Sequence, residues 1–207
     1  MFSTRQQAGA DLARALTKFT DSTPVVLALP RGGVPLGLQV AKALDAPLDV
    51  LIVRKLGAPH NPEFAIGAVG EGGAVVLDHP SIDALDLSEV IVDRLISEAR
   101  SEIDRRVDTY RHGNELIDVA DRVVIIVDDG LATGATAEAA VAVARHLGAA
   151  RVVLAVPTGS HQAVERLTAV CDEVICLEIP EWFGSVGSQY VMFPQVRDDE
   201  VIAMLDL

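Results

Sequence analysis

Two adjacent acids, followed by a loop rich in glycine and threonine, form the most informative pattern in the sequence. Asp128 and Asp129 come directly after the apolar residues 124–127, and residues 130–136 read Gly-Leu-Ala-Thr-Gly-Ala-Thr. A helix is expected to begin near residue 136. The end of the loop would then present free backbone N–H groups and a helix dipole that favours an anion. The loop therefore predicts a phosphate site.

The two acids indicate what kind of phosphate compound would bind. Carboxylates repel a phosphate, so Asp128 and Asp129 fit neighbouring hydroxyl groups or a hydrated Mg²⁺ instead. A phosphate at one end with vicinal hydroxyls beside it describes a ribose 5-phosphate. A Walker A loop would need Gly-Lys-Ser/Thr, and the dinucleotide fingerprint Gly-x-Gly-x-x-Gly is absent from this loop.

The same segment resembles the motif that binds 5-phosphoribosyl-1-pyrophosphate (PRPP) in the type I phosphoribosyltransferases. That motif has four hydrophobic residues, two acids and then Gly-x-x-Thr-Gly-x-Thr, as residues 124–136 do. The resemblance implies that PRPP is bound by Asp128, Asp129, Gly130, Ala132, Thr133, Gly134, Ala135 and Thr136. It also implies Mg²⁺ as a cofactor, held by Asp128 and Asp129 through water.

A second segment looks like the family's pyrophosphate loop. Leu29-Pro30-Arg31-Gly32-Gly33 follows the first expected strand, and Arg54-Lys55 ends the second. By the resemblance, the PRPP ligands here are Pro30, Arg31, Gly32, Gly33, Arg54 and Lys55. Arg31 and Lys55 are expected to reach the pyrophosphate together, while the glycines expose backbone N–H groups.

The reaction that the resemblance implies takes place at the anomeric carbon of the ribose. Pyrophosphate leaves and a nitrogen heterocycle enters, so catalysis needs positioning, neutralisation of the leaving group and exclusion of water. Mg²⁺ bridging pyrophosphate and ribose hydroxyls would supply much of the neutralisation. The expected catalytic residues are Asp128, Asp129, Lys55 and Arg31.

The acceptor base is indicated less clearly than the donor. Residues 179–187 are similar to the base-contacting hood of the hypoxanthine-guanine enzymes, which places Phe183 against the base, with Trp182 beside it. Ala132, however, stands where those enzymes have an aspartate and matches the Ala-Thr-Gly of the adenine enzymes. The strand that ends at 157–160 also lacks their lysine. A purine-like base is favoured, and its identity stays open.

Two other functions remain open beside the transferase. One is a PRPP-binding regulator that keeps the fold without turnover. The other is a PRPP or nucleotide hydrolase, with water as the acceptor. The intact pyrophosphate loop and both motif acids favour the enzyme.

The elements that must position these residues alternate between strand and helix. Apolar runs near residues 25–29, 48–53, 122–127, 151–156 and 174–177 predict buried strands, with helices at 5–20, 34–44, 136–147 and 160–169 between them. This order predicts an α/β fold, a parallel sheet with helices on both faces. Ligands would bind beyond the carboxyl ends of its strands.

One domain is expected to span residues 1–207, with an inserted hairpin and helix region at 70–115 and a small C-terminal hood at 178–207. The insertion would pair residues 64–69 with 74–77. A long helix at 88–111 would follow, burying Val90, Ile91, Leu95, Ile96 and Ile103. Its five arginines are expected mostly on a solvated face, with one possible reach to the pyrophosphate or to a neighbouring subunit. They are Arg94, Arg100, Arg105, Arg106 and Arg111.

The composition of the chain limits the classes of molecule that it is expected to bind. Half of the 207 residues are apolar, and the formal charge of −13 without a dense basic run argues against nucleic acid and anionic membranes. Neither a signal segment nor a membrane-length apolar run is seen. Cys171 and Cys176 are expected to be buried thiols. The expected partners are PRPP and a small heterocycle, in the cytoplasm, with the oligomeric state open.

Overall fold

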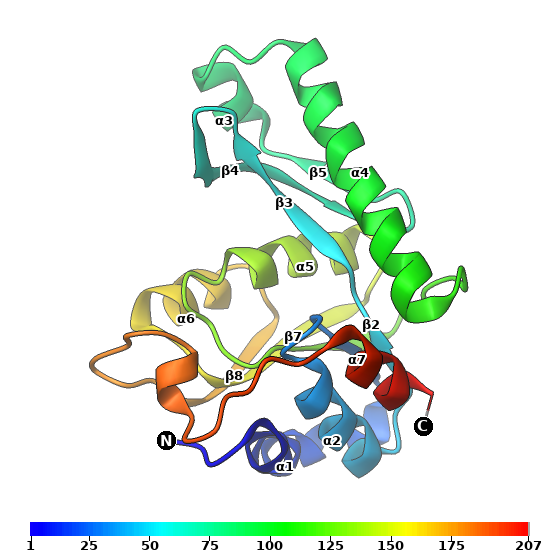
Figure 1. Ribbon diagram of the computed structural model, residues 1–207, viewed down its shortest axis with the longest axis vertical. Coiled ribbons are helices and arrows are strands. Elements are labelled where there is room, and N and C mark those ends of the chain that lie inside the picture. The colour runs from blue at the N-terminus through cyan, green and yellow to red at the C-terminus, as the bar shows by residue number, and fades with distance from the viewer. Residues whose placement is uncertain (207) are drawn as a thin grey trace.

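The computed structural model describes residues 1–206, and it contains two sheets (Figure 1). The larger is parallel, with strand order β2-β1-β6-β7-β8. Its strands are β1 (Val25–Ala28), β2 (Leu48–Val50), β6 (Val123–Val127), β7 (Arg151–Thr158) and β8 (Glu173–Glu178). β1 and β6 are neighbours, with Val26 opposite Ile125 and Ala28 opposite Val127. This sheet confirms the predicted α/β class.

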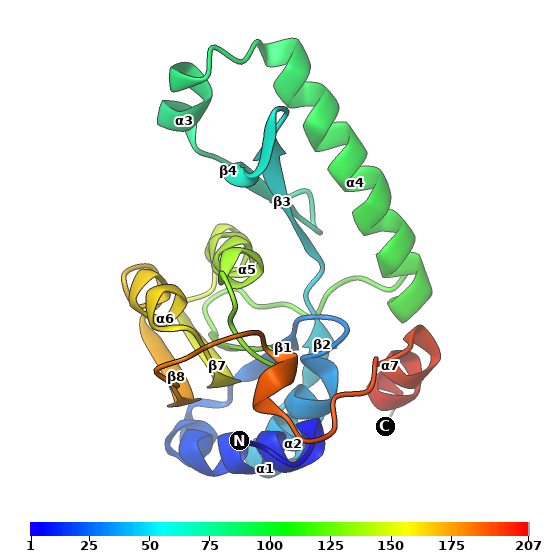
Figure 2. The same ribbon diagram turned by 60° about the vertical axis from the view of Figure 1, so that its left-hand side comes forward.

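Alternating side chains of the central strands supply both hydrophobic layers. One layer packs Val26, Ile125 and Val153 against helices α1 (Arg5–Leu16) and α2 (Val34–Leu44). The other packs Leu27, Ile126 and Leu154 against α5 (Ala135–His146) and α6 (His161–Thr168). Figure 2 shows the two pairs of helices on opposite faces of the sheet. Period-two alternation on a sheet that is covered on both sides explains why each strand reads as continuously apolar.

The smaller sheet is antiparallel, in the order β3-β4-β5, and it stands over α5 (Figure 1). Its strands are β3 (Val53–Ala58), β4 (Asn61–Gly70) and β5 (Val75–Leu77), followed by α3 (His79–Ala84) and the long α4 (Glu89–Arg111). The expected pairing of the hairpin is confirmed, with Val69 opposite Val75. The expected long helix is confirmed as α4. We refer to residues 53–111 as the arm.

Three details of the arm differ from the sequence interpretation. Arg54 and Lys55 do not end a strand of the parallel sheet; they lie inside β3, because the chain leaves that sheet at Val50. Residues 50–53 are all apolar across the point where the chain leaves the sheet, so composition could not mark the change of sheet. Val90 is 78% exposed rather than buried, since it lies in the first turn of α4. The short helix α3 was not predicted.

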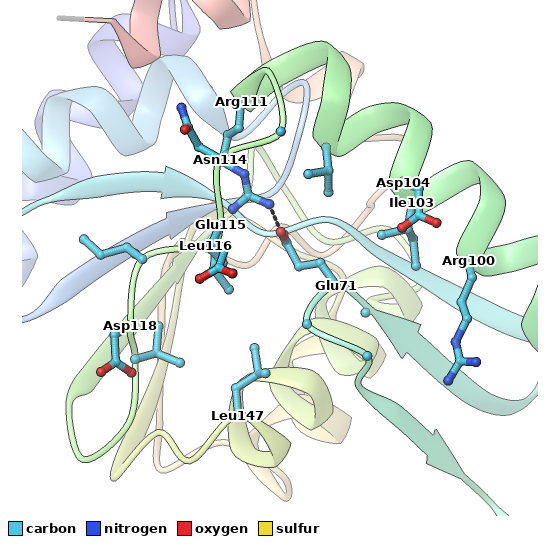
Figure 3. Close-up of a pocket in the computed structure, with 17 residues that line it drawn as sticks. Glu71, Arg100, Ile103, Asp104, Arg111, Asn114, Glu115, Leu116, Asp118 and Leu147 are labelled. Atoms are coloured by element: carbon cyan, nitrogen blue, oxygen red, sulfur yellow. Dashed lines mark ion pairs between the residues drawn. The ribbon is translucent and has the colours of Figure 1, made fainter.

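A buried ionic triad joins the arm to the parallel sheet, and we call it the latch; Figure 3 shows its Arg111–Glu71 pair. Arg111, at the end of α4, pairs with Asp49 of β2 at 3.2 Å and with Glu71 after β4. Backbone N–H groups also bind the acids: Ile52 donates to Glu71 at 2.8 Å, and Ile117 donates to Asp49 at 3.1 Å. A cavity of about 520 Å³ opens beside Arg111 and Glu71. The latch fixes the base of the arm.

The C-terminal segment runs from β8 back to the N-terminus and then to α2 and α4. After loop 179–186, a 3-10 turn at Gly187–Gln189 leads to Tyr190, which pairs with Phe2 of the N-terminus. Helix α7 (Asp198–Leu205) then packs against α2 and α4. Leu207, the last residue of the predicted hood, lies outside the described residues. Within residues 1–206, no helix is long and apolar enough to cross a membrane, and Cys171 and Cys176 carry free thiols.

Candidate active site

The two motif segments meet because they follow neighbouring parallel strands. The N–H of Leu29, after β1, donates to the carbonyl of Val127 at the end of β6 over 2.8 Å. The loop with Arg31 and Gly32 therefore lies beside Asp129. A side chain at Gly32 would collide with the Asp129 carboxylate, so the loop can come this close only with glycine there.

The two acids share a site that is poor in compensating charge. Asp128 Oδ1 accepts a hydrogen bond from the Asp129 N–H at 2.8 Å, and Asp129 Oδ2 pairs with Arg5 Nε at 2.9 Å. Burial, and next the charge of Asp129, raise the pKa of Asp128 well above its usual value. Burial also raises the pKa of Asp129, although Arg5 opposes this.

Arg5 is a site residue that sequence reasoning missed. Its side chain is 8% exposed, and Nη1 donates to the Pro194 carbonyl at 2.6 Å. The guanidinium lies 3.6 Å from the centre of the Phe193 ring, a cation–π contact. Tyr190 donates from its hydroxyl to the Asp129 carbonyl at 2.6 Å, so N-terminal helix and C-terminal tail converge on one acid. The sequence feature that could have identified Arg5 is its position on the apolar face of α1, in line with Ala8 and Leu12, where a charged residue is unexpected.

The loop after the acids is held by the β7–α6 connection. The Leu131 N–H donates to the Thr158 carbonyl at 3.0 Å. The Ser160 N–H donates to the Leu131 carbonyl at 2.9 Å, and Ser160 Oγ donates to the Ala132 carbonyl at 2.7 Å. Arg166 of α6 donates to the Thr133 carbonyl. Gly134 takes a left-handed φ of 73° as the residue before α5, a conformation that favours glycine. Contacts within the chain therefore hold the loop, and it ends at a helix N-terminus as the sequence predicted.

A cavity of about 370 Å³ opens at the junction of these segments. Its wall includes Arg5, Arg31, Gly32, Asp129 and Phe193. A divalent cation fits the two acids, because their like charges and buried setting leave negative charge that Arg5 alone does not balance. Among residues 1–206, no group of three or more histidine, cysteine or acidic residues could hold a metal ion alone. A cation here would thus take further ligands from substrate and water.

Lys55 and Arg54 lie on opposite faces of the antiparallel sheet, because neighbouring residues of a strand alternate. Arg54 points to α4, where its Nη1 lies 3.7 Å from Glu102. Lys55 faces α5 and lines a cleft of about 350 Å³ together with Ala135 and Arg166. Lys55 is thus placed across from the start of α5, and its joint action with Arg31 on a pyrophosphate stays a prediction.

The hood residues named from the sequence are placed in loop 179–186. Trp182 is 89% exposed, whereas Phe183 is half-buried. The aromatic residue that lines the cavity beside Asp129 is Phe193, ten residues further on. The base-binding role of Phe183 and Trp182 stays a prediction.

Comparison with known proteins agrees with this geometry. The family described as phosphoribosyl transferase domain matches residues 4–191. Two Mycobacterium tuberculosis proteins, Rv0571c and MT0597, are each 48% identical over 206 residues; their names carry a provisional assignment as phosphoribosyl transferases. The match takes in all of this chain but 46% of each relative, so the chain spans about half their length.

Solved structures show the same fold. The crystal structure of TT1426 from Thermus thermophilus is 45% identical, with a TM-score of 0.93 over 99% of this chain and 97% of that one. A purine phosphoribosyltransferase from Pyrococcus horikoshii is 18% identical, with a TM-score of 0.50 over 93% and 92% of the two chains. At that identity, the second likeness concerns the fold alone. The domain match and the relatives together show that the chain belongs to the phosphoribosyltransferase domain family.

Proposed function

We propose that the protein transfers ribose 5-phosphate from PRPP to a nitrogen heterocycle and releases pyrophosphate. The observation that carries the proposal is the placement of two under-compensated acids between a glycine-rich turn and a helix N-terminus. Phosphate suits the helix end, and hydroxyl groups or a metal suit the acids. A ribose carrying phosphate at one end and pyrophosphate at the other would contact all three features.

In this proposal each segment of the site has a separate task. Residues 130–136 bind the 5-phosphate through backbone N–H groups and the hydroxyls of Thr133 and Thr136. Asp128 and Asp129 orient the ribose hydroxyls, and Arg5 fixes the Asp129 carboxylate. Pro30, Arg31, Gly32 and Gly33 receive the pyrophosphate, with Lys55 approaching from the arm. Fixed donors aimed at a departing group lower the barrier without reorganisation at the moment of reaction.

Mg²⁺ is proposed as the cofactor, held at Asp128 and Asp129 through water. When bound, it would neutralise charge on the pyrophosphate and tie it to the ribose hydroxyls. The chain's own groups would hold the charges of the site in place, since Phe193 stacks on Arg5 and Tyr190 binds the backbone carbonyl of Asp129.

A purine-like base is the proposed acceptor. The aromatic side chains of loop 179–186 and the tail after it offer flat faces, and Phe183 is the residue proposed to stack on the base. Trp182 is the second candidate, since an indole with 89% of its surface exposed is free to be covered by a ligand.

The test is a screen of nitrogen heterocycles with PRPP and Mg²⁺, reading pyrophosphate release and product mass. Release that depends on one added base, with the matching ribonucleotide as product, supports the transferase. Release without any base favours the hydrolase, and tight PRPP binding without release favours the regulator. If PRPP does not bind, the proposal fails.

A further inference from the structure

A second cavity adjoins the loop of residues 30–33, with Pro30 and Arg31 in its wall. Its volume is about 360 Å³, and its wall includes Arg31, Arg105, Arg106, Tyr110 and Asp198. Arg31 also lines the cavity beside Asp129, so the two cavities meet at this side chain. The wall carries three guanidinium groups against one carboxylate, in a chain with a formal charge of −13. A positively charged cavity in an otherwise acidic protein favours the binding of an anionic ligand.

The arginines of this cavity come from segments far apart in the sequence. Arg31 follows β1, whereas Arg105 and Arg106 lie in the last two turns of α4, beside α7 (Figures 1 and 2). Glu102, one turn earlier on α4, binds Arg105 and Arg106 at 2.9 Å each, and Arg54 at 3.7 Å. One carboxylate thus serves three guanidinium groups. Glu102 orients the three guanidinium groups, but its single negative charge does not neutralise their three positive charges.

Asp198 is the carboxylate that lines this cavity. Tyr110 donates to Asp198 Oδ1 at 2.6 Å, and Arg31 Nη1 lies 3.7 Å from the same oxygen. Burial, together with the bond to Asp198, raises the pKa of Tyr110 to about 12, so the hydroxyl remains a donor at neutral pH. The Arg31 contact is long for an ion pair, so a ligand with more negative charge could replace Asp198 as its partner.

The ordinary interpretation of these residues is a solvated helix face with surface ion pairs. Arg94 and Glu98 show what that looks like: both side chains are about two-thirds exposed and they pair only along the helix, at 3.8 Å. Arg106 differs, since its side chain is 38% exposed and lines a cavity together with Arg31. Arg105 is 63% exposed and pairs with Glu102 along the helix, as Arg94 does with Glu98, but unlike Arg94 it lines this cavity. The site is therefore built from three segments and not from one helix face.

We infer that Arg105 and Arg106 of α4, together with Arg31, form a fixed subsite for the far phosphate of a pyrophosphate group. A diphosphate suits the geometry better than a single phosphate, because it can contact the pyrophosphate loop and still reach the second cavity past Arg31. Guanidinium groups bind phosphate oxygens in pairs, which gives direction as well as attraction. The inference rests on the proposed function, and it assigns to α4 a substrate contact outside both sequence motifs.

The test is calorimetric titration of inorganic pyrophosphate, with Mg²⁺, into the wild type and single variants. Arg105→Ala and Arg106→Ala are expected to weaken pyrophosphate binding about tenfold or more, as the loss of a charge-assisted bond does. Arg94→Ala, on the same helix and away from the cavity, is the matched control and should bind as the wild type does. Thermal unfolding of each variant verifies that the fold is kept.

Asp198→Asn gives an effect of opposite sign, which no misfolded variant would imitate. Removing the carboxylate that competes for Arg31 should tighten pyrophosphate binding. Equal pyrophosphate affinity in the wild type, Arg105→Ala and Arg106→Ala would overturn the subsite, and weaker binding by Asp198→Asn would overturn the role of Asp198. A parallel PRPP titration separates the two claims, because a wild type that binds no PRPP defeats the proposed function instead.

Discussion

The molecule contains two buried arginines that each face a pair of acids. The two pairs of acids differ in how many hydrogen-bond donors their carboxylates have. In the latch, Arg111 is 7% exposed and faces Asp49 and Glu71. At the candidate site, Arg5 is 8% exposed and faces Asp129, with Asp128 beside it. Residue types and burial are nearly the same in both places.

The difference lies in the remaining donors. Each carboxylate of the latch also binds backbone N–H groups, from Val50 and Ile117 to Asp49 and from Ile52 to Glu71. At the site, Asp128 binds only the Asp129 N–H within the described residues, and burial raises the pKa of both acids. The carboxylates of the latch are thus satisfied by backbone donors, although Arg111 Nε has no hydrogen-bond partner among residues 1–206. The carboxylates of the candidate site have fewer donors, which suits acids that bind a ligand.

The largest effect expected is on the latch. Arg111→Ala would leave two acids buried without their cation, so we expect a loss of about 3–5 kcal/mol in the free energy of unfolding. Urea unfolding measures this, with Arg100→Ala, exposed on the same helix, as the control. A loss no larger than that of the control would mean that the latch does not hold the arm.

The next effect concerns Asp128, where function and stability should separate. Asp128→Asn should lower turnover with PRPP on the order of 100-fold, because a charge aimed at the ribose and metal is lost. A raised carboxyl pKa means that the ionised form burdens the folded state, so neutral Asn should leave thermal stability equal or higher at pH 7. The exposed Asp121→Asn is the matched control; near-normal turnover of Asp128→Asn would defeat the assignment.

Arg5 should matter less for stability than Arg111, although it is as deeply buried. Arg5→Ala releases an acid that borders a cavity, where water can reach it, so we expect a loss of about 1–3 kcal/mol. Adding Asp129→Asn should recover part of this loss, since the two residues form one pair. Chemical unfolding of both single variants and the double variant tests the comparison, and a loss as large as that of Arg111→Ala would break it.

The smallest effect on stability is expected at Trp182. Its side chain is 89% exposed, so Trp182→Ala should change the free energy of unfolding by less than about 0.5 kcal/mol. If the indole covers the base, the KM for the acceptor should rise while the KM for PRPP stays the same. An unchanged acceptor KM would remove Trp182 from the base site.

The sequence was informative where a local pattern decides the structure. Residues 34–44 were predicted as a helix and form α2 with those bounds, and the loop at 130–136 ends at a helix as expected. Each of these features follows from neighbours in the chain: apolar spacing, a glycine turn and strand-forming runs.

Contacts between distant segments could not be predicted from the sequence. Arg5 binds Asp129, 124 residues further along the chain, and Arg106 lines the same cavity as Arg31. The spacing of residues in the sequence predicts neither of these contacts. Arg54 and Lys55 were placed at a strand end because residues 50–53 before them are all apolar, while the chain in fact changes sheet between Val50 and Val53. Only the packing of β3 between α5 and α4 determines which way those two side chains face.

The most direct test of the central claim is a calorimetric titration of PRPP, with Mg²⁺, into the wild type and into a variant that carries both Asp128→Asn and Asp129→Asn. We expect saturable binding at one site per chain in the wild type and loss of that binding in the double variant, with the fold retained. Absence of PRPP binding in the wild type, or equal affinity in both proteins, would contradict a PRPP site at these two acids.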